Sequence, residues 1–148
     1  MENMEILKNV FLFRNLPTLE LLKFNKVIKH SSFKKDDIII KQGEKGDMMY
    51  IVKNGSINIF VSLDKDNEDK KLIAVLGPGD HFGEMALFDD ALRSATVESR
   101  EEVDLLTISR GDLEHIMNSD KDLAVLIYKE MVASLSERLR KTNEMLLL

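Results

Sequence analysis

A repeated alternation between short apolar runs and turn residues occupies the middle of the chain and limits its fold most. The runs are rich in branched residues: Ser31–Lys34, Ile38–Lys41, Met48–Lys53, Ser56–Leu63, Lys71–Leu76, Arg93–Ser99 and Val103–Ser109. Turn residues separate them at Asp36-Asp37, residues 43–47, Asn54-Gly55 and residues 77–80. Seven or eight short strands at this spacing predict a β-sandwich or a jelly-roll barrel.

Two of the connections carry more specific expectations. Asn54-Gly55 lies between Ile51-Val52 and Ile57, and an Asn-Gly pair favours a two-residue hairpin turn with positive φ at both central residues. The segment Asp64–Lys70 is charged and polar, and we expect it to form a solvated hairpin tip.

Helical patterns flank the strands on both sides. From Met4 to about Ile28 the apolar residues follow a helical period, with a break at Leu16-Pro17-Thr18. After residue 109 this period returns, and Ser109 and Ser119 each stand three residues before an aspartate, a spacing that favours a helix N-terminus.

These patterns together predict an α+β fold that is mainly β. We expect a double-stranded β-helix, or jelly-roll barrel, with N-terminal helices and a long C-terminal helix. One domain would cover residues 1–148, divided into a helical arm over 1–29, a barrel over 30–109 and C-terminal helices over 110–148.

The last predicted helix carries an apolar seam with alternating spacings of three and four residues. We call these residues the α-helical seam: Val125, Tyr128, Val132, Leu135, Leu139, Thr142 and Leu146. Such a seam can dock on the chain's own barrel or pair with a second copy. We favour pairing, a homodimer through residues 120–147, because the seam is longer than a small barrel would cover.

Composition excludes several classes of function. The chain has 148 residues, a net charge of −5 and no cysteine, which argues against general nucleic-acid binding and excludes thiolate chemistry. His30, His81 and His115 do not have metal-ligand spacing, so no metal site is expected. No apolar run would span a bilayer, and we expect a cytoplasmic protein without membrane contact or enzymatic activity.

The segment Phe82–Val97 is the strongest candidate for a binding site. Its Gly-Glu-Met-Ala-Leu run can form a short helical turn whose first N–H groups attract an anion. Arg93, nine residues after Glu84, can approach the same anion with its fork of donors. The alternative is a polar loop in which Glu84 and Arg93 form a weak surface ion pair.

Three longer motifs resemble one family, the cyclic nucleotide-binding domain of catabolite-activator-like regulators, cyclic-nucleotide-dependent kinases and cyclic-nucleotide-gated channels. The motifs are Lys41–Asp47, Tyr50–Gly55 and Gly77–Glu84, and Phe82–Val97 is similar to the family's phosphate-binding cassette. The resemblance covers nearly the whole chain. It implies a cyclic nucleotide as ligand, with cAMP expected and cGMP as the alternative.

The resemblance also implies a set of ligand-binding residues: Phe82, Gly83, Glu84, Met85, Ala86, Leu87, Arg93, Ser94, Ala95, Ile59, Ile73, Thr142 and Asn143.

Among these residues, the family assigns contacts to each part of the nucleotide. Glu84 would accept a hydrogen bond from the ribose 2′-hydroxyl, and Gly83 would let the backbone approach the sugar. N–H groups around Ala86 and Leu87 would face the cyclic phosphate. Arg93 would pair with the phosphate charge, and the Ser94 side chain and Ala95 N–H would donate to it. Ile59 and Ile73 would lie against the base.

Base recognition rests on residues that resemble the catabolite activator. Ser94 follows the arginine as serine does there, whereas Leu92 departs from the family's common proline. The segment Arg138–Asn143 resembles the part of that protein whose hydroxyl side chains reach the adenine amino group, which makes Thr142 and Asn143 the candidates for base recognition. A polar Thr142 in an apolar seam can instead fix helix register.

The expected function is a cyclic-nucleotide receptor that signals by movement of its C-terminal helix to an unidentified protein partner. The alternative is the sensor half of a DNA-binding regulator whose helix-turn-helix domain is absent from this chain. The reading frame after Leu148 would separate the two. A third possibility is an interaction protein that has lost its ligand, and the intact Glu84 and Arg93 argue against it.

Overall fold

The computed structural model describes residues 2–64 and 69–146. Its helices are α1 (Glu2–Lys8), α2 (Thr18–Val27), α3 (Arg110–Ser119) and α4 (Lys121–Leu146), with a 3-10 helix η1 (Glu84–Leu87). The strands in the described ranges are β1 (Lys29–Phe33), β2 (Ile38–Ile40), β3 (Met48–Asn54), β4 (Ile57–Ser62), β5 (Lys70–Leu76), β6 (His81–Phe82), β7 (Thr96–Ser99) and β8 (Val103–Ser109). The chain forms two compact units, one from residues 27–113 and one that joins the segment up to residue 26 to the segment from residue 114 onward.

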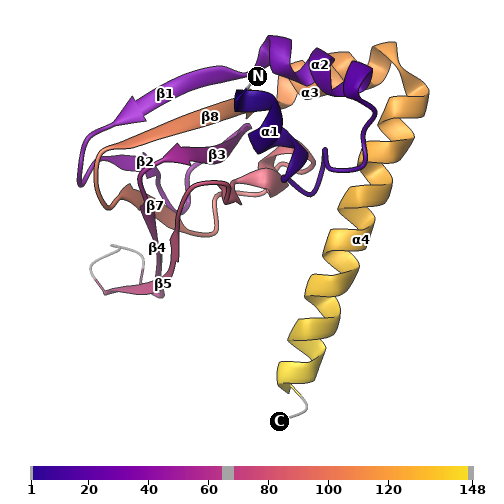
Figure 1. The fold of residues 1–148 in the computed structure, drawn as a ribbon. Coiled ribbons are helices and arrows are strands. Elements are labelled where there is room, and N and C mark those ends of the chain that lie inside the picture. Colours follow the sequence, from indigo (N-terminus) through magenta and orange to yellow (C-terminus); the bar gives the residue numbers. More distant parts are fainter. Residues whose placement is uncertain (1, 65–68, 147–148) are drawn as a thin grey trace. The chain divides into compact units, whose positions relative to one another are not determined.

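The unit of residues 27–113 is a sandwich of two antiparallel four-stranded sheets (Figure 1). The strand orders are β1-β8-β3-β6 and β2-β7-β4-β5. Buried apolar side chains from both sheets form the core between them: Ile40, Val52, Ile57, Phe82, Val97, Val103 and Leu105. This arrangement confirms the predicted α+β fold with a two-sheet β-structure, N-terminal helices and a long C-terminal helix.

One strand is missing from the sequence prediction and another begins later than predicted, both for local reasons. β6 has only two residues, too few for a period to appear in the sequence. The run predicted from Arg93 becomes a strand only at Thr96. The main chain of Arg93 bonds instead to the turn before β3, since Gly43 N donates to Arg93 O and Arg93 N donates to Glu44 O, both at 2.8 Å.

The predicted hairpin at Asn54-Gly55 is wrong. β3 and β4 belong to different sheets, so this turn carries the chain from one sheet to the other. Gly55 has φ of 86°, whereas Asn54 has no positive φ, so the type I′ geometry is not formed. A side chain on Gly55 would overlap the carbonyl oxygen of Glu102, and this close approach explains the glycine. β4 does form a hairpin with β5. Residues 65–68 of its predicted solvated tip lie outside the described residues.

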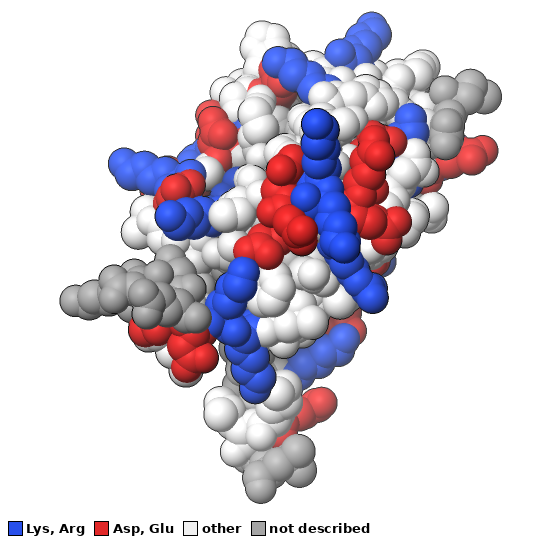
Figure 2. Space-filling view, turned by 90° about the vertical axis from the view of Figure 1, so that its left-hand side faces the viewer, with Lys and Arg blue, Asp and Glu red and all other residues white. Residues whose placement is uncertain are grey.

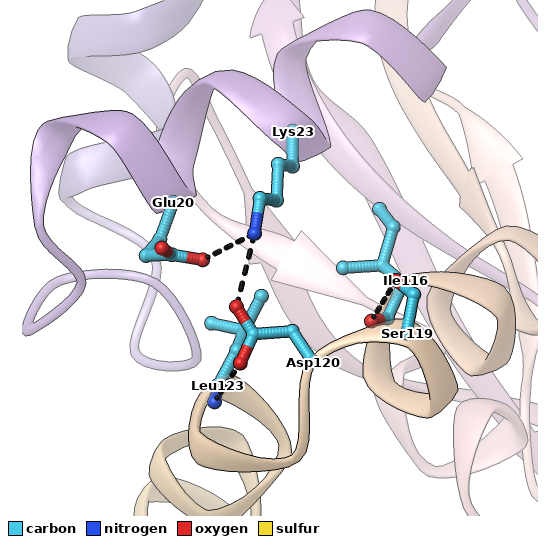
Figure 3. Close-up of polar contacts among 6 residues, drawn as sticks. All are labelled: Glu20, Lys23, Ile116, Ser119, Asp120 and Leu123. Atoms are coloured by element: carbon cyan, nitrogen blue, oxygen red, sulfur yellow. Dashed lines mark hydrogen bonds and ion pairs between the residues drawn. The ribbon is translucent and has the colours of Figure 1, made fainter.

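In the helical unit, α2 and the start of α4 are joined by a network of charges (Figure 3). The Lys23 ammonium lies 2.9 Å from Asp120 Oδ2 and 3.0 Å from Glu20 Oε2. The hydrogen bond to Asp120 is the main reason why the pKa of Lys23 is raised. In the same unit, the buried rings of Phe13 and Phe24 have centroids 4.7 Å apart.

The two predicted helix starts have different outcomes. Ser109 caps α3 as expected, because its hydroxyl accepts a hydrogen bond from Asp112 N at 3.1 Å. Ser119 does not cap α4. Its hydroxyl donates to Ile116 O at 2.9 Å at the end of the preceding helix, and Asp120 Oδ1 accepts from Leu123 N at 3.1 Å (Figure 3). The cap therefore lies one residue later, since the chain turns between α3 and α4.

The buried side of α4 is not the predicted seam. Leu123, Ala124, Ile127 and Met131 are the buried residues of this helix. Val132 and Leu139 of the seam are 63% and 61% exposed, and the other apolar seam residues are exposed as well. The seam is thus a second apolar side, which the rest of the helical unit leaves uncovered. Among the described residues, no helix is both long and apolar enough to cross a bilayer.

Candidate functional site

The cassette begins where β6 ends and the backbone turns at Gly83. Gly83 has φ of 79° and ψ of 12°, a left-handed conformation that favours glycine, and η1 follows it directly. Within this turn Ala86 N donates to Gly83 O at 3.3 Å, and Phe88 N donates to Met85 O at 3.0 Å. The Ala86 N–H expected to face a phosphate is therefore within reach of Gly83 O in this structure.

Arg93 is held beside this turn by two main-chain carbonyls. Its Nη2 donates to Met48 O at 3.0 Å, and its Nη1 lies 3.3 Å from Gly83 O. The guanidinium lies so close to Gly46 that a side chain there would overlap it, and a Cβ on Gly83 would lie 2.9 Å from Nη1. Two glycines from separate segments thus make room for one cationic group.

A small cavity of about 150 Å³ opens next to Arg93. It is lined by the end of β2, the turn before β3 and the start of β3: Ile39, Ile40, Lys41, Glu44, Lys45, Gly46, Asp47, Met48 and Tyr50, with Arg93. Three of these side chains are cationic and two are anionic. The cavity is therefore lined by both charged and apolar residues.

Tyr50 connects this cavity to the cassette. Its ring stacks on that of Phe82 with centroids 5.0 Å apart and an interplanar angle of 9°. Burial raises the pKa of Tyr50 and Asp47 adds to the rise, while the nearby Arg93 opposes it. The phenol therefore stays neutral near pH 7 and acts as a wall.

Glu84 is the only carboxylate within η1, and it is 8% exposed. Its Oε2 lies 3.6 Å from Nδ1 of His81. The side chain therefore does not form the alternative surface ion pair with Arg93 that the sequence left open, since the Arg93 guanidinium donates to the main-chain oxygens of Gly83 and Met48.

The remaining predicted cassette residues differ in exposure. Ala86 and Leu87 are buried, and Met85 is 49% exposed. Ser94 is exposed and Ala95 is half-buried just before β7. The side chain of Ser94 is thus accessible to a small molecule from solvent.

The two predicted base-contacting residues lie at a bulge between β4 and β5. Ile59 pairs with Ala74 and Phe60 pairs with Leu72, so Ile73 is the extra residue of the bulge. Ile59 packs against the core, and Ile73 is 55% exposed. An apolar surface is therefore present at this position of the edge strand.

Thr142 and Asn143 lie in α4, within the helical unit. Both are exposed, and the Thr142 hydroxyl donates to Arg138 O at 2.9 Å within its own helix. Their predicted role in base recognition stays a prediction.

Sequence reasoning missed the residues that hold the arginine. Gly46 and Tyr50 lie in the motifs Lys41–Asp47 and Tyr50–Gly55, and Met48 lies between these motifs, but the sequence assigned no role to any of the three. Their signal is weak in the sequence, because Met48 acts through its carbonyl and Gly46 through the absence of a side chain. Among the described residues, no group of three potential metal ligands gathers.

The fold is a β-sandwich in which a cationic group lies beside a glycine turn. The family model of the cyclic nucleotide-binding domain matches residues 30–120. The chain belongs to this family.

Individual relatives show the same relationship. A cGMP-dependent protein kinase of Drosophila melanogaster, isozyme 2 forms cD5/T2, is 32% identical over 120 residues, which are 80% of this chain and 13% of the kinase. The catabolite activator protein of Thermus thermophilus has a TM-score of 0.79 at 28% identity over 93% of this chain and 62% of its own. The regulatory domain of Toxoplasma gondii PKA, solved with cAMP, has a TM-score of 0.71 at 31% identity over 78% of this chain and 43% of its own.

Proposed function

We propose that this chain is a cyclic-nucleotide receptor module whose ligand is cAMP and which binds without catalysis. The observation that carries the proposal is the placement of Arg93 between Gly83 and Met48 O beside η1. A guanidinium has five N–H donors, and the two carbonyls engage only two of its nitrogens. The remaining donors can pair with a phosphate in the bidentate geometry that arginine favours.

Other residues of the cassette would complete the contacts. Glu84, buried and acceptor-only when ionised, suits the ribose 2′-hydroxyl. Ser94 and the Ala95 N–H would add bonds to the phosphate, and N–H groups around Ala86 and Leu87 would turn to it. The apolar surface of Ile59 and Ile73 would cover one side of the base.

The preference for cAMP rests on three features. Ser94 and the Thr142-Asn143 pair resemble the catabolite activator, and the Toxoplasma gondii regulatory domain was solved with cAMP. A second candidate, cGMP, is supported by the similarity to a cGMP-dependent kinase. The chain spans 13% of that kinase, so kinase activity is not carried over.

Calorimetry with cAMP, cGMP and linear 5′-AMP tests the ligand. We expect a dissociation constant for cAMP in the submicromolar to micromolar range, equivalent to about −8 kcal/mol or better. Binding of cGMP should be weaker, and 5′-AMP should be weakest. Absence of both heat and thermal stabilisation with cAMP and cGMP would rule out the receptor.

The proposed output is a change in the position of α4 that a homodimer partner or another protein detects. A ligand shifts such an equilibrium only through different affinities for the two states. The exposed apolar seam of α4 offers the surface on which a second copy can pair. The alternative output is DNA binding through a domain outside this chain. On the face in Figure 2, Lys and Arg side chains are interspersed with Asp and Glu side chains, which does not favour nucleic-acid binding by this chain alone.

A further inference from the structure

Arg110, the first residue of α3, bonds to a loop of the cassette that has no regular structure. Its Nη1 donates to Asp89 O at 3.0 Å and to Asp90 Oδ1 at 2.7 Å. These two aspartates follow η1, in the span between that helix and Arg93. One guanidinium therefore fixes both the main chain and a side chain at the middle of the span.

The main chain of Arg110 bonds to a second segment near Arg93, the turn before β3. Arg110 N donates to Asp47 O at 2.7 Å, at the end of the turn before β3. The same turn pairs with the main chain of Arg93 through Gly43 and Glu44. The span that leads into Arg93 and the turn whose Gly46 lies against its guanidinium are thus both anchored to one residue.

Burial indicates which of these bonds matters most. The Arg110 side chain is 28% exposed, whereas that of Asp90 is 93% exposed. An exposed ion pair is weak and is screened by salt. The bond from the charged guanidinium to the Asp89 carbonyl is part-buried and does not depend on a titrating partner. It is therefore the more persistent of the two.

We propose that Arg110 is a positioning residue for the cyclic-nucleotide site. It holds the span 88–92 in the conformation that presents Arg93, without touching the ligand. A loop that is already ordered loses less conformational entropy on binding, and this preorganisation raises affinity. The proposal rests on the function proposed above.

The test compares Arg110→Ala, Arg110→Lys and the matched control Arg100→Ala by cAMP calorimetry and by amide hydrogen exchange of the ligand-free proteins. Arg100 is exposed, and its main-chain N–H donates to Ser56 O at 3.0 Å, a bond that the alanine variant keeps. We expect Arg110→Ala to weaken cAMP binding about tenfold and to accelerate exchange within residues 88–93. Lysine should restore part of the affinity, and Arg100→Ala should match the wild type.

Two results would overturn the proposal. One is Arg110→Ala binding within twofold of the wild type with unchanged exchange in residues 88–93. The other is faster exchange throughout the sandwich, which would mean a general structural role. If the wild type binds neither nucleotide, the receptor function fails, while exchange in the ligand-free variant still decides whether Arg110 orders the span.

The single substitution Asp90→Ala separates the contributions of the two bonds to cAMP affinity. Because Asp90 is exposed, its substitution should weaken cAMP binding less than twofold, and less still at high salt. An effect of Asp90→Ala as large as that of Arg110→Ala would contradict the larger role given to the Asp89 carbonyl.

Discussion

The Arg93 guanidinium occupies a space that exists because residue 46 has no side chain. Gly83 serves the same group in a second way, since its left-handed backbone directs its carbonyl toward Nη1 and its missing Cβ leaves room there. At the residue scale, the site therefore depends as much on main-chain geometry as on side-chain chemistry. Gly55 shows that the fold uses the same device away from the site.

Gly55→Ala should destabilise the sandwich unit by about 1–3 kcal/mol, because the residue combines a positive φ with a backbone atom in the way of a Cβ. Denaturant unfolding measures this. The control is Gly77→Ala, where a Cβ would meet nothing within 4 Å. Equal stability of the two variants would show that the turn is not constrained as described.

Glu84→Gln should weaken cAMP binding at least about tenfold, because a hydrogen bond to a charged group is worth about 1.5–3 kcal/mol. The glutamine keeps the shape of the side chain and removes the charge. Titration with 2′-deoxy-cAMP is the control, since it lacks the hydroxyl that Glu84 would bind. The variant and the wild type should bind this analogue alike, and an equal loss with both ligands would contradict the assigned contact.

At the element scale, the start of α4 depends on Asp120. Its pKa is lowered below the ordinary 3.8, first by the Leu123 N–H and then by Lys23. A carboxylate with a lowered native pKa contributes stability that is present above its unfolded value and lost as pH falls through the native value.

The melting temperature should therefore separate two substitutions at this position. Asp120→Ala removes both the helix cap and the ion pair, so it should lower the melting temperature more than Asp120→Asn, which keeps a capping oxygen. The difference in melting temperature between the wild type and the asparagine variant should be constant near neutral pH and should become smaller below about pH 4. A difference that grows on acidification would contradict the assigned pKa direction.

Elements with a clear period could be predicted from the sequence, and those set by tertiary contacts could not. The longer strands and both flanking helical regions follow from apolar spacing and turn residues. The turn at Asn54-Gly55 was mispredicted because the local pattern does not say which sheet receives the next strand. For the site, Glu84 and Arg93 were identified by motif, whereas the support from Met48 O and Arg110 depends on chain segments that meet only in the fold.

At the scale of the whole molecule, the exposed seam of α4 predicts association. Leu139 is 61% exposed and Val132 is 63% exposed, on a side of the helix distinct from its buried residues. Analytical ultracentrifugation should show a dimer for the wild type and a monomer for Leu139→Glu. Arg140→Glu places the same charge on another side of the helix and should stay dimeric. A monomeric wild type would contradict pairing through this seam.

The central claim is that Arg93 binds the phosphate of a cyclic nucleotide, and calorimetry of Arg93→Ala with cAMP tests it most directly. Charge-assisted bidentate bonds are among the strongest in proteins, so the variant should bind about a hundredfold more weakly than the wild type. Arg100→Ala should be unaffected. An Arg93→Ala protein that is folded and binds cAMP within twofold of the wild type would contradict the claim.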